Sequence, residues 1–211
     1  MKIIDCEQGS PEWLAARLGK VTASRVSDVT AKGGGACRAR YMAELISERL
    51  TGLRRDGFKS ASMERGNEQE ESARRRYQFM ADMVVSTVGL VLHPTIDNAA
   101  ASPDGLAGDQ GIVQFKCPDT HTHIDTLRGG SVPGSYQKQM QWEMACTGRA
   151  WCDFVSFDPR MPEDMQMRII RFPRDPKMIV DLEREVRAFL AEVDANIADL
   201  LARYRQHEAA E

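Results

Sequence analysis

Three polar residues in the middle of the chain have types and spacing suited to hydrolysis at a divalent cation. Asp104 lies in the turn sequence Ser-Pro-Asp-Gly, and Gln114 and Lys116 follow within a largely apolar run. Side chains two apart on a strand point to the same face, so Gln114 and Lys116 should face the same way. A hairpin before them would bring Asp104 alongside. Mg²⁺ prefers oxygen ligands and activates water, and a lysine offsets charge on a phosphate.

The apolar periodicity and the turn residues predict the elements that must position these side chains. Strands are expected over 83–92, 98–102, 111–117, 150–157 and 165–172, with a hairpin over 105–110. Helices are expected over 11–18, 22–30, 36–51, 62–80, 134–147 and 175–206. Ser10 and Pro11 are typical of a helix N-cap and first residue. The order predicts one α/β domain over 1–211, with a mixed central sheet flanked by helices.

The charge of the chain excludes a polybasic binder but not a local basic surface. The 211 residues hold 28 Lys and Arg and 31 Asp and Glu, for a net charge of −3. Residues 1–80 hold 15 basic and 11 acidic side chains, and residues 81–211 hold 13 and 20. We therefore expect DNA-facing arginines in the first part and a solvent-facing acidic helix at the end of the second.

The cysteines and the N-terminal segment predict a reduced, cytoplasmic protein without a membrane segment. The five cysteines are an odd number, and the first residues lack the apolar core of a signal peptide. Cys117, His121 and His123 are close enough in sequence to suggest zinc. The chain has no CxxC and no second ligand pair at a familiar spacing, so loop histidines in solvent are the favoured interpretation.

Several blocks of the chain, in order, resemble the lambda exonuclease-like family, which includes YqaJ-type viral recombinases and phage alkaline exonucleases and belongs to the PD-(D/E)xK nuclease superfamily. The resemblance spans roughly residues 8–175. The matching blocks are Trp13…Arg17-Leu18-Gly19…Thr22-Ala23-Ser24, Gly66…Glu70…Ala73-Arg74, Ser102-Pro103-Asp104-Gly105, Lys116-Cys117-Pro118, Tyr136…Gln139…Gln141 and Phe157-Asp158-Pro159-Arg160-Met161. An isolated D…xK pattern is weak, but its coincidence with the other blocks is specific.

The resemblance implies a restriction-endonuclease-like core and assigns roles to matching residues. Asp104, position 114 and the main-chain carbonyl of Phe115 match ligands of Mg²⁺, for which Mn²⁺ could substitute. Glu70 matches a helix carboxylate that assists the metal or its water, and Lys116 matches the catalytic lysine. The residues that match a site for the 5′-terminal phosphate are Arg17, Ser24, Ser102 and Gln139.

The resemblance also implies an activity and partners. It implies 5′→3′ digestion of one strand of linear double-stranded DNA, which leaves a 3′ single-stranded overhang for homologous recombination. It implies a ring-shaped homotrimer around the duplex and a single-strand annealing protein as partner. The expected setting is the cytoplasm of a bacterial host, with the protein encoded by a phage or prophage.

Gln114 departs from the family pattern, which has Glu at this position. Gln is nearly the same shape but neutral, so cation binding and water activation should both weaken. Either the Gln is natural and Glu70 compensates, or the chain is an engineered near-isosteric knockout that binds DNA without cutting it. We favour the second explanation because every other matching position is intact. A non-catalytic DNA-end-binding recombination scaffold is the main alternative function, and a site-specific endonuclease is a third.

Ordinary structural explanations exist for several of these residues. A glutamate in a charged run such as Glu70 usually faces solvent, and Asp104 is a normal turn residue. Four basic residues could line the path of a duplex or belong to a solvated loop: Arg54, Arg55, Lys59 and Arg65. Three tryptophans are most simply core or subunit-interface residues: Trp13, Trp142 and Trp151.

Overall fold

The computed structural model describes residues 1–31, 35–54 and 61–205, giving only the backbone of 61–68 and of 205. Its helices are α1 (Pro11–Arg17), α2 (Val26–Val29), α3 (Ala36–Thr51), α4 (Ala61–Ala81), α5 (Thr120–Leu127), α6 (Gly134–Thr147) and α7 (Pro176–Arg205), with short 3-10 turns η1 (Ala23–Arg25) and η3 (Glu163–Met165). Its strands are β1 (Lys2–Ile4), β2 (Val21–Thr22), β3 (Val85–Ser86), β4 (Leu90–Leu92), β5 (Ala99–Ala101), β6 (Gly105–Ala107), β7 (Gly111–Lys116), β8 (Trp151–Phe157) and β9 (Met167–Pro173). The described helices include none with the length and apolar character that a membrane crossing requires.

The strands form two mixed sheets, where the sequence predicted one mixed central sheet. One sheet has the order β1-β4-β5-β2, in which β2 runs parallel to β5 and the other pairs are antiparallel. The second has the order β3-β6-β7-β8-β9, in which β7 and β8 are parallel and the other pairs antiparallel. A parallel pair needs a long crossover, and α5 and α6 provide it. The α/β class, with sheets flanked by helices, is confirmed.

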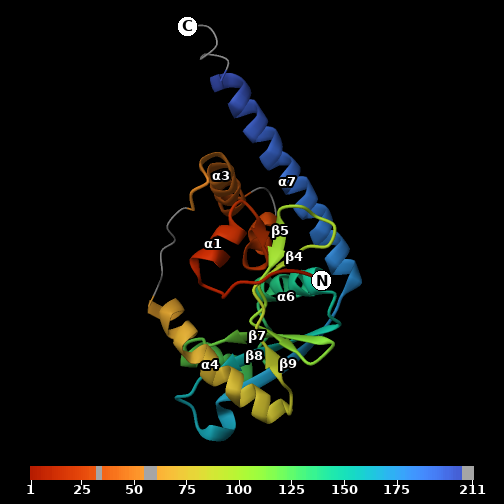
Figure 1. Ribbon diagram of the computed structural model, residues 1–211. Coiled ribbons are helices and arrows are strands. Elements are labelled where there is room, and N and C mark those ends of the chain that lie inside the picture. The colour runs from red at the N-terminus through yellow and green to blue at the C-terminus, as the bar shows by residue number, and fades with distance from the viewer. Residues whose placement is uncertain (32–34, 55–60, 206–211) are drawn as a thin grey trace.

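The five-stranded sheet lies between α4 on one face and α6 on the other (Figure 1). Along β7 the side chains alternate between these faces, as strand geometry requires. Phe115 packs edge-on against Tyr77 of α4, with ring centroids 5.9 Å apart. Gln114 meets Gln139 of α6, and Lys116 lies over the ring of Tyr136 from the same helix. Gln114 and Lys116 therefore share one face, as their spacing predicted.

A second core joins α2, α3 and α7 to the other side of α6 and to the four-stranded sheet. Tyr41 of α3 stacks on Phe189 of α7, and Trp142 of α6 donates its indole N–H to the carbonyl oxygen of Ala100 at 3.2 Å. β5 consists of three buried alanines, so α6 can approach this strand closely. Helix α6 therefore packs against both sheets (Figure 1).

The strand predicted over 83–92 is wrong as a single element. The segment divides into β3 and β4, which belong to different sheets. Gly89 lies at the break, where a Cβ atom would stand 2.7 Å from the Cys6 carbonyl oxygen. The close approach of the N-terminal segment thus needs a glycine there. The hairpin over 105–110 also differs, because residues 105–107 themselves form β6, which pairs with β7.

Residues 120–127, expected as a loop with solvated histidines, form α5 instead. His121 is exposed, but His123 is fully buried, with its ring nitrogens 2.8 Å from Ser156 Oγ and 2.8 Å from the Met165 carbonyl oxygen. These contacts explain how a polar ring is accommodated in the core. Across the described ranges, no cluster of three or more His, Cys, Asp or Glu side chains could hold a metal ion.

We predict that Asp153→Ala destabilises the five-stranded sheet. The buried Asp153 carboxylate of β8 accepts hydrogen bonds from the Tyr77 hydroxyl and from Arg171 Nε, each at 2.8 Å. Its removal leaves two donors without their acceptor, so the free energy of unfolding should fall by about 2 kcal/mol in urea denaturation followed by circular dichroism. Asp109→Ala, in the exposed β6–β7 turn, is the control and should change it by less than about 0.5 kcal/mol. Equal losses in the two variants would contradict the prediction.

Candidate active site

Asp104 occupies the point where the chain passes from one sheet to the other. It lies between β5 of the four-stranded sheet and β6 of the five-stranded sheet. Its Oδ2 accepts a hydrogen bond from the backbone N–H of Phe115 at 2.7 Å and another from Gln114 Nε2. Both donors belong to β7. The turn aspartate and the central strand, separated by ten residues in sequence, therefore meet at the end of the β6–β7 hairpin.

A chain of hydrogen bonds continues from Gln114 into the protein interior. Gln139 Nε2 of α6 donates to Gln114 Oε1 at 3.0 Å and to Glu143 Oε1 at 2.9 Å. Gln114 is 2% exposed and Glu143 is completely buried. An uninterrupted row of polar side chains thus runs from the partly buried Asp104 to Glu143 in the core.

The electrostatics of this row favour protonated carboxyl groups. Burial raises the pKa of Asp104 to about 7; the Lys116 ammonium opposes this shift, and the Glu70 carboxylate adds to it. Burial also raises the pKa of Glu143 to about 8, and the negative charge of Asp104 contributes to that rise. A positive charge placed at Asp104 would relieve this excess of negative charge.

Glu70 and Lys116 stand near Asp104 without forming an ion pair with it. Glu70 Oε1 instead accepts from Arg74 Nη2 one helical turn along α4, at 3.0 Å. Lys116 Nζ lies 5.0 Å from the centroid of the Tyr136 ring. Both side chains interact electrostatically with Asp104. The structure therefore gathers Asp104, Gln114, Phe115, Lys116 and Glu70 around one position.

A second polar group adjoins the first through Ser102, two residues before Asp104. The Trp13 indole Nε1 donates to Ser102 Oγ at 2.9 Å, and Arg17 Nη1 lies 3.5 Å from the same oxygen. The Arg17 guanidinium is 4.0 Å from the centroid of the Trp13 ring, and its Nη2 is 3.4 Å from Thr22 Oγ1. Burial lowers the pKa of Arg17 to about 10, which leaves the guanidinium charged at neutral pH.

The other residues expected at a phosphate site are placed differently. Ser24 is exposed on η1, and in the described part of the chain no hydrogen bond joins its side chain to Arg17 or Ser102. Gln139 is close to Gln114, but both its N–H groups already have acceptors. Of the four candidate duplex-lining residues, Arg54 is described, whereas Arg55, Lys59 and Arg65 lie outside the described residues.

Some members of both groups, among them Asp104, Glu70 and Trp13, line a cleft of about 1160 Å³. Asp104, Glu70 and Arg74 form one side, Trp13 belongs to α1, and the segment from Ile3 to Gly9 forms much of the rest. Arg54 reaches the same cleft. Trp13 is therefore a residue of the cleft, whereas Trp142 is completely buried in the core.

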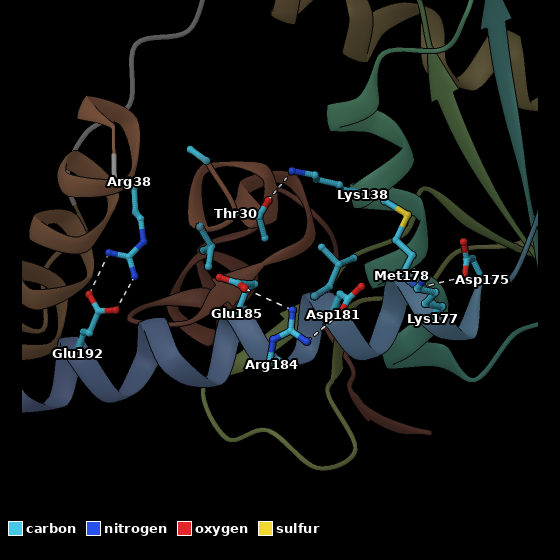
Figure 2. Close-up of a pocket in the computed structure, with 13 residues that line it drawn as sticks. Thr30, Arg38, Lys138, Asp175, Lys177, Met178, Asp181, Arg184, Glu185 and Glu192 are labelled. Carbon is cyan, nitrogen blue, oxygen red and sulfur yellow. Dashed lines mark hydrogen bonds and ion pairs between the residues drawn. The ribbon is translucent and has the colours of Figure 1, made fainter. Parts of the chain in front are cut away.

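A second cavity of about 720 Å³, shown in Figure 2, lies where α7 passes α2, α3 and α6. Its charged side chains mostly neutralise one another. Arg38 pairs with Glu192 at 2.6 Å and Arg184 with Asp181 at 2.8 Å, while Lys138 Nζ donates to Thr30 Oγ1 at 2.7 Å. Such paired charges are typical of helix packing. The cleft at Asp104 is the better candidate for catalysis.

Glu143 is the main site residue that the sequence analysis missed. It lies in the helical segment Gln-Met-Gln-Trp-Glu-Met-Ala-Cys, where apolar neighbours surround it on both sides. Two signals were available: a charged residue within an apolar helix, and its spacing of four from Gln139, which places both on one helical face.

The oxygen donors near Asp104 agree in kind with a Mg²⁺ site, which takes one or two carboxylates and keeps several waters. The feature that supports a cation there is the pair of carboxyl groups, Asp104 and Glu70, on the wall of one cleft. Position 114 does not contribute an oxygen as arranged, because Gln114 directs its amide nitrogen toward Asp104. The oxygen donors that the structure brings together here are the carboxylates of Asp104 and Glu70, and the Phe115 carbonyl stays a predicted ligand.

Comparison with known proteins gave one family and several structures. The model of the YqaJ-like viral recombinase domain matches residues 12–150. An alkaline exonuclease from Laribacter hongkongensis, LHK-Exo, is 52% identical with a TM-score of 0.89, over 93% of this chain and 99% of that one. A phage-related exonuclease from Haemophilus somnus 129PT is 16% identical with a TM-score of 0.65, over 86% and 96% of the two chains, and shares the fold. A search of curated sequences found no relative.

We predict that Glu143→Gln changes how stability depends on pH. A carboxyl group whose pKa is raised by folding keeps its proton in the folded state and loses it in the unfolded state. The ordinary pKa of the group is 4.5, and its pKa in the folded protein is about 8. Between these two pH values, the group therefore lowers the free energy of unfolding as the pH rises. Glu143→Gln removes this contribution. Over that pH range, the free energy of unfolding of the variant should therefore fall by less than that of the parent, with a difference of more than ~1 kcal/mol.

Urea denaturation across this pH range measures the effect in the metal-free protein. Glu7→Gln, which removes an exposed carboxylate of the cleft, is the control and should keep the slope of the parent. The same slope in Glu143→Gln and in the parent would show that Glu143 is ionised in the folded protein throughout.

Proposed function

The chain belongs to the family of YqaJ-like viral recombinase domains, and we propose on that premise that it is a DNA exonuclease that acts from duplex ends. The 52% identity to the alkaline exonuclease LHK-Exo, over nearly all of both chains, supports the activity. That relative was also solved with dAMP, a nucleoside monophosphate such as an exonuclease releases. The observation within this chain that carries the proposal is the junction of the Asp104 group with the Arg17–Ser102 group.

The first group would carry out hydrolysis with Mg²⁺ or Mn²⁺. Asp104 and the Phe115 carbonyl would hold the ion, which supplies an activated water and offsets charge on the scissile phosphate. Lys116, close to Asp104 on the same face of β7 as Gln114, would stabilise negative charge that develops on that phosphate. Glu70, held by Arg74, would accept a proton from the attacking water or orient it.

The second group would hold the terminal 5′-phosphate. Arg17 carries a guanidinium that can form two parallel hydrogen bonds to phosphate oxygens, and Ser102 adds a hydroxyl donor. Ser24 and Gln139 remain proposed members, each of which would have to turn its donors toward the phosphate. Because Ser102 is two residues from Asp104, the end phosphate would fix the cutting position without any contact to bases.

Further features of the proposal come from the family resemblance. They are digestion from 5′ to 3′, a 3′ overhang for homologous recombination, a homotrimeric ring around the duplex, and a single-strand annealing partner. A ring would retain the substrate by topology while its contacts with DNA stay weak enough for sliding. This fits a chain whose cleft is lined by more acidic than basic side chains. A phage or prophage protein acting in the cytoplasm of its host is the matching setting.

We predict that Gln114→Glu increases exonuclease activity with Mg²⁺ by at least ~100-fold, since it restores a charged oxygen ligand. The measurement is release of nucleotides from end-labelled linear duplex. Gln110→Glu adds the same charge in the exposed β6–β7 turn and should leave the rate unchanged. If the parent already digests linear duplex as fast as Gln114→Glu does, position 114 has been assigned wrongly.

Substrate topology separates the proposed function from its rivals. The Gln114→Glu protein should digest linear duplex and leave closed circular DNA intact. Cleavage of closed circles would indicate an endonuclease. A non-catalytic end-binding scaffold is favoured by one observation, the hydrogen bond from Gln114 to Asp104, which occupies an oxygen of the proposed metal ligand. Tight binding to ends without digestion in both proteins would support that alternative.

We predict that Arg17→Ala abolishes the preference for a 5′-phosphate. In the Gln114→Glu background, initial rates are compared on duplexes that carry a 5′-phosphate or a 5′-hydroxyl. Loss of a charged hydrogen-bond donor should lower this ratio by about 10-fold or more. Arg75→Ala removes an exposed arginine of α4 that pairs with Glu71, and should preserve the ratio. An unchanged ratio in Arg17→Ala would exclude Arg17 from the phosphate site.

A further inference from the structure

Helix α3 lies beside α1 (Figure 1), and it binds the backbone of the segment that follows Arg17, the last residue of α1. Within this segment, Gly19 donates its backbone N–H to Glu48 Oε2 at 2.8 Å. The Gly19 carbonyl oxygen accepts a hydrogen bond from Arg49 Nε at 2.9 Å. Both polar groups of the Gly19 backbone are therefore bound by neighbouring side chains of α3, as buried backbone groups require.

Tyr41, on the same helix, binds the other end of this segment. Its hydroxyl donates to the Lys20 carbonyl oxygen at 3.3 Å and accepts from the Thr22 backbone N–H at 3.4 Å. Thr22 Oγ1 in turn lies 3.4 Å from Arg17 Nη2. Because α3 binds the segment at both ends, the position of Arg17 relative to β2 depends on α3.

Gly19 adopts a backbone conformation that few other residues tolerate. Its φ is +68°, in the left-handed region, and a Cβ atom there would stand 2.8 Å from Cγ of Arg49. The Arg49 side chain therefore packs directly against this turn. Because the turn sets the path of the chain between α1 and β2, its fit against α3 determines where α1 ends.

The Arg17 guanidinium keeps donors for a ligand, because the described residues place no carboxylate in an ion pair with it. Its hydrogen-bond contacts are the hydroxyl oxygens of Ser102 and Thr22, at 3.5 and 3.4 Å. Glu48 interacts electrostatically with Arg17, but its Oε2 accepts from Gly19. A negative charge thus stands near Arg17 without a bidentate pair that would compete with phosphate.

We propose that Glu48 and Arg49 are positioning residues for Arg17: by binding Gly19 they fix the guanidinium beside Ser102 and so set the preference for a 5′-phosphate. This inference rests on the proposed function, in which Arg17 and Ser102 hold that phosphate. Glu48 is 8% exposed and acts through Gly19 rather than by contact with DNA. Two parallel hydrogen bonds to a phosphate need exact placement, so a small displacement of Arg17 should be costly.

The test measures binding to DNA ends by the full-length, metal-free protein. A hairpin DNA with one open end, labelled in its loop, ends in either a 5′-phosphate or a 5′-hydroxyl, and fluorescence anisotropy gives the Kd for each. The ratio of the two Kd values is the preference. We expect the parent to bind the phosphorylated end about 10-fold more tightly, and Arg17→Ala to lose this preference.

Substitutions of Glu48 separate a positioning role from a merely structural one. Glu48→Ala removes the acceptor of the Gly19 N–H and should lower the preference by about fivefold or more, whereas lost stability alone would leave the ratio unchanged. Glu48→Gln keeps an oxygen at that place, so the preference should stay within about twofold of the parent. The control is Glu192→Ala, which removes a carboxylate that pairs α7 with Arg38 at 2.6 Å and should keep the preference.

Arg49→Met is the second variant, and it serves if Glu48→Ala fails to fold. It keeps an apolar side chain against the turn but removes the donor to the Gly19 carbonyl oxygen, so the preference should fall here too. Its control is Asp194→Ala, which removes the other partner of Arg49, at 2.6 Å, and leaves Arg49 Nε on Gly19. Urea denaturation establishes that each variant is folded.

The possible failures of the two proposals have different signatures. A preference that is lost in Arg17→Ala but kept in folded Glu48→Ala or Arg49→Met would overturn the positioning role and leave the phosphate site standing. Equal losses in Glu48→Gln and Glu48→Ala would also overturn it, because the hydrogen bond to Gly19 would then not be the cause. If the parent itself shows no preference, the phosphate site and the positioning role both fall.

Discussion

The hydrogen bond from the Phe115 backbone N–H to Asp104 is the constraint on which the candidate site depends. Asp104 lies where the chain leaves the four-stranded sheet, and Phe115 lies in the middle of the five-stranded sheet. The bond joins the two sheets at one point and fixes the position of the turn at Asp104 relative to β7. Ser102 on one side and Gln114 on the other are then placed within a few residues of the same carboxylate. Helix α6 completes the arrangement, because its buried face contacts both sheets.

Much of this arrangement could be predicted from local sequence patterns. The Ser10 cap is confirmed by its 3.1 Å bond from the Trp13 N–H, and the spacing of Gln114 and Lys116 placed them on one face. The family blocks also indicated which residues gather near Asp104. Local patterns could not show that 83–92 divides between two sheets, since the break depends on the N-terminal segment approaching Gly89 from far away in sequence. Nor could they show that Gln139 would use both its N–H groups inside the protein.

In the folded protein, the excess positive charge of the first part of the sequence lies partly beside the excess negative charge of the last part. The predicted DNA-facing residues of the basic first part do not include Arg38 and Arg49 of α3, and these two arginines pair with Glu192 and Asp194 of α7, each at 2.6 Å. Excess positive charge in one segment is thus partly neutralised by excess negative charge in another. The contacts join α3, in the basic first part of the sequence, to α7, the last described helix. Sequence composition cannot separate such internal compensation from a binding surface, because both produce the same count of charges.

The two donors that converge on Ser102 have a consequence for the shape of the adjoining pocket. Trp13 Nε1 at 2.9 Å and Arg17 Nη1 at 3.5 Å both point at the serine oxygen and occupy its lone pairs. A hydroxyl that already accepts twice can only donate, and its hydrogen must turn away from both. Ser102 therefore behaves as a donor with a preset direction, much like a backbone N–H, and discriminates against ligands that offer a hydrogen there. The indole that orients it also supports Arg17 at 4.0 Å, so one tryptophan gives the pocket two fixed donors.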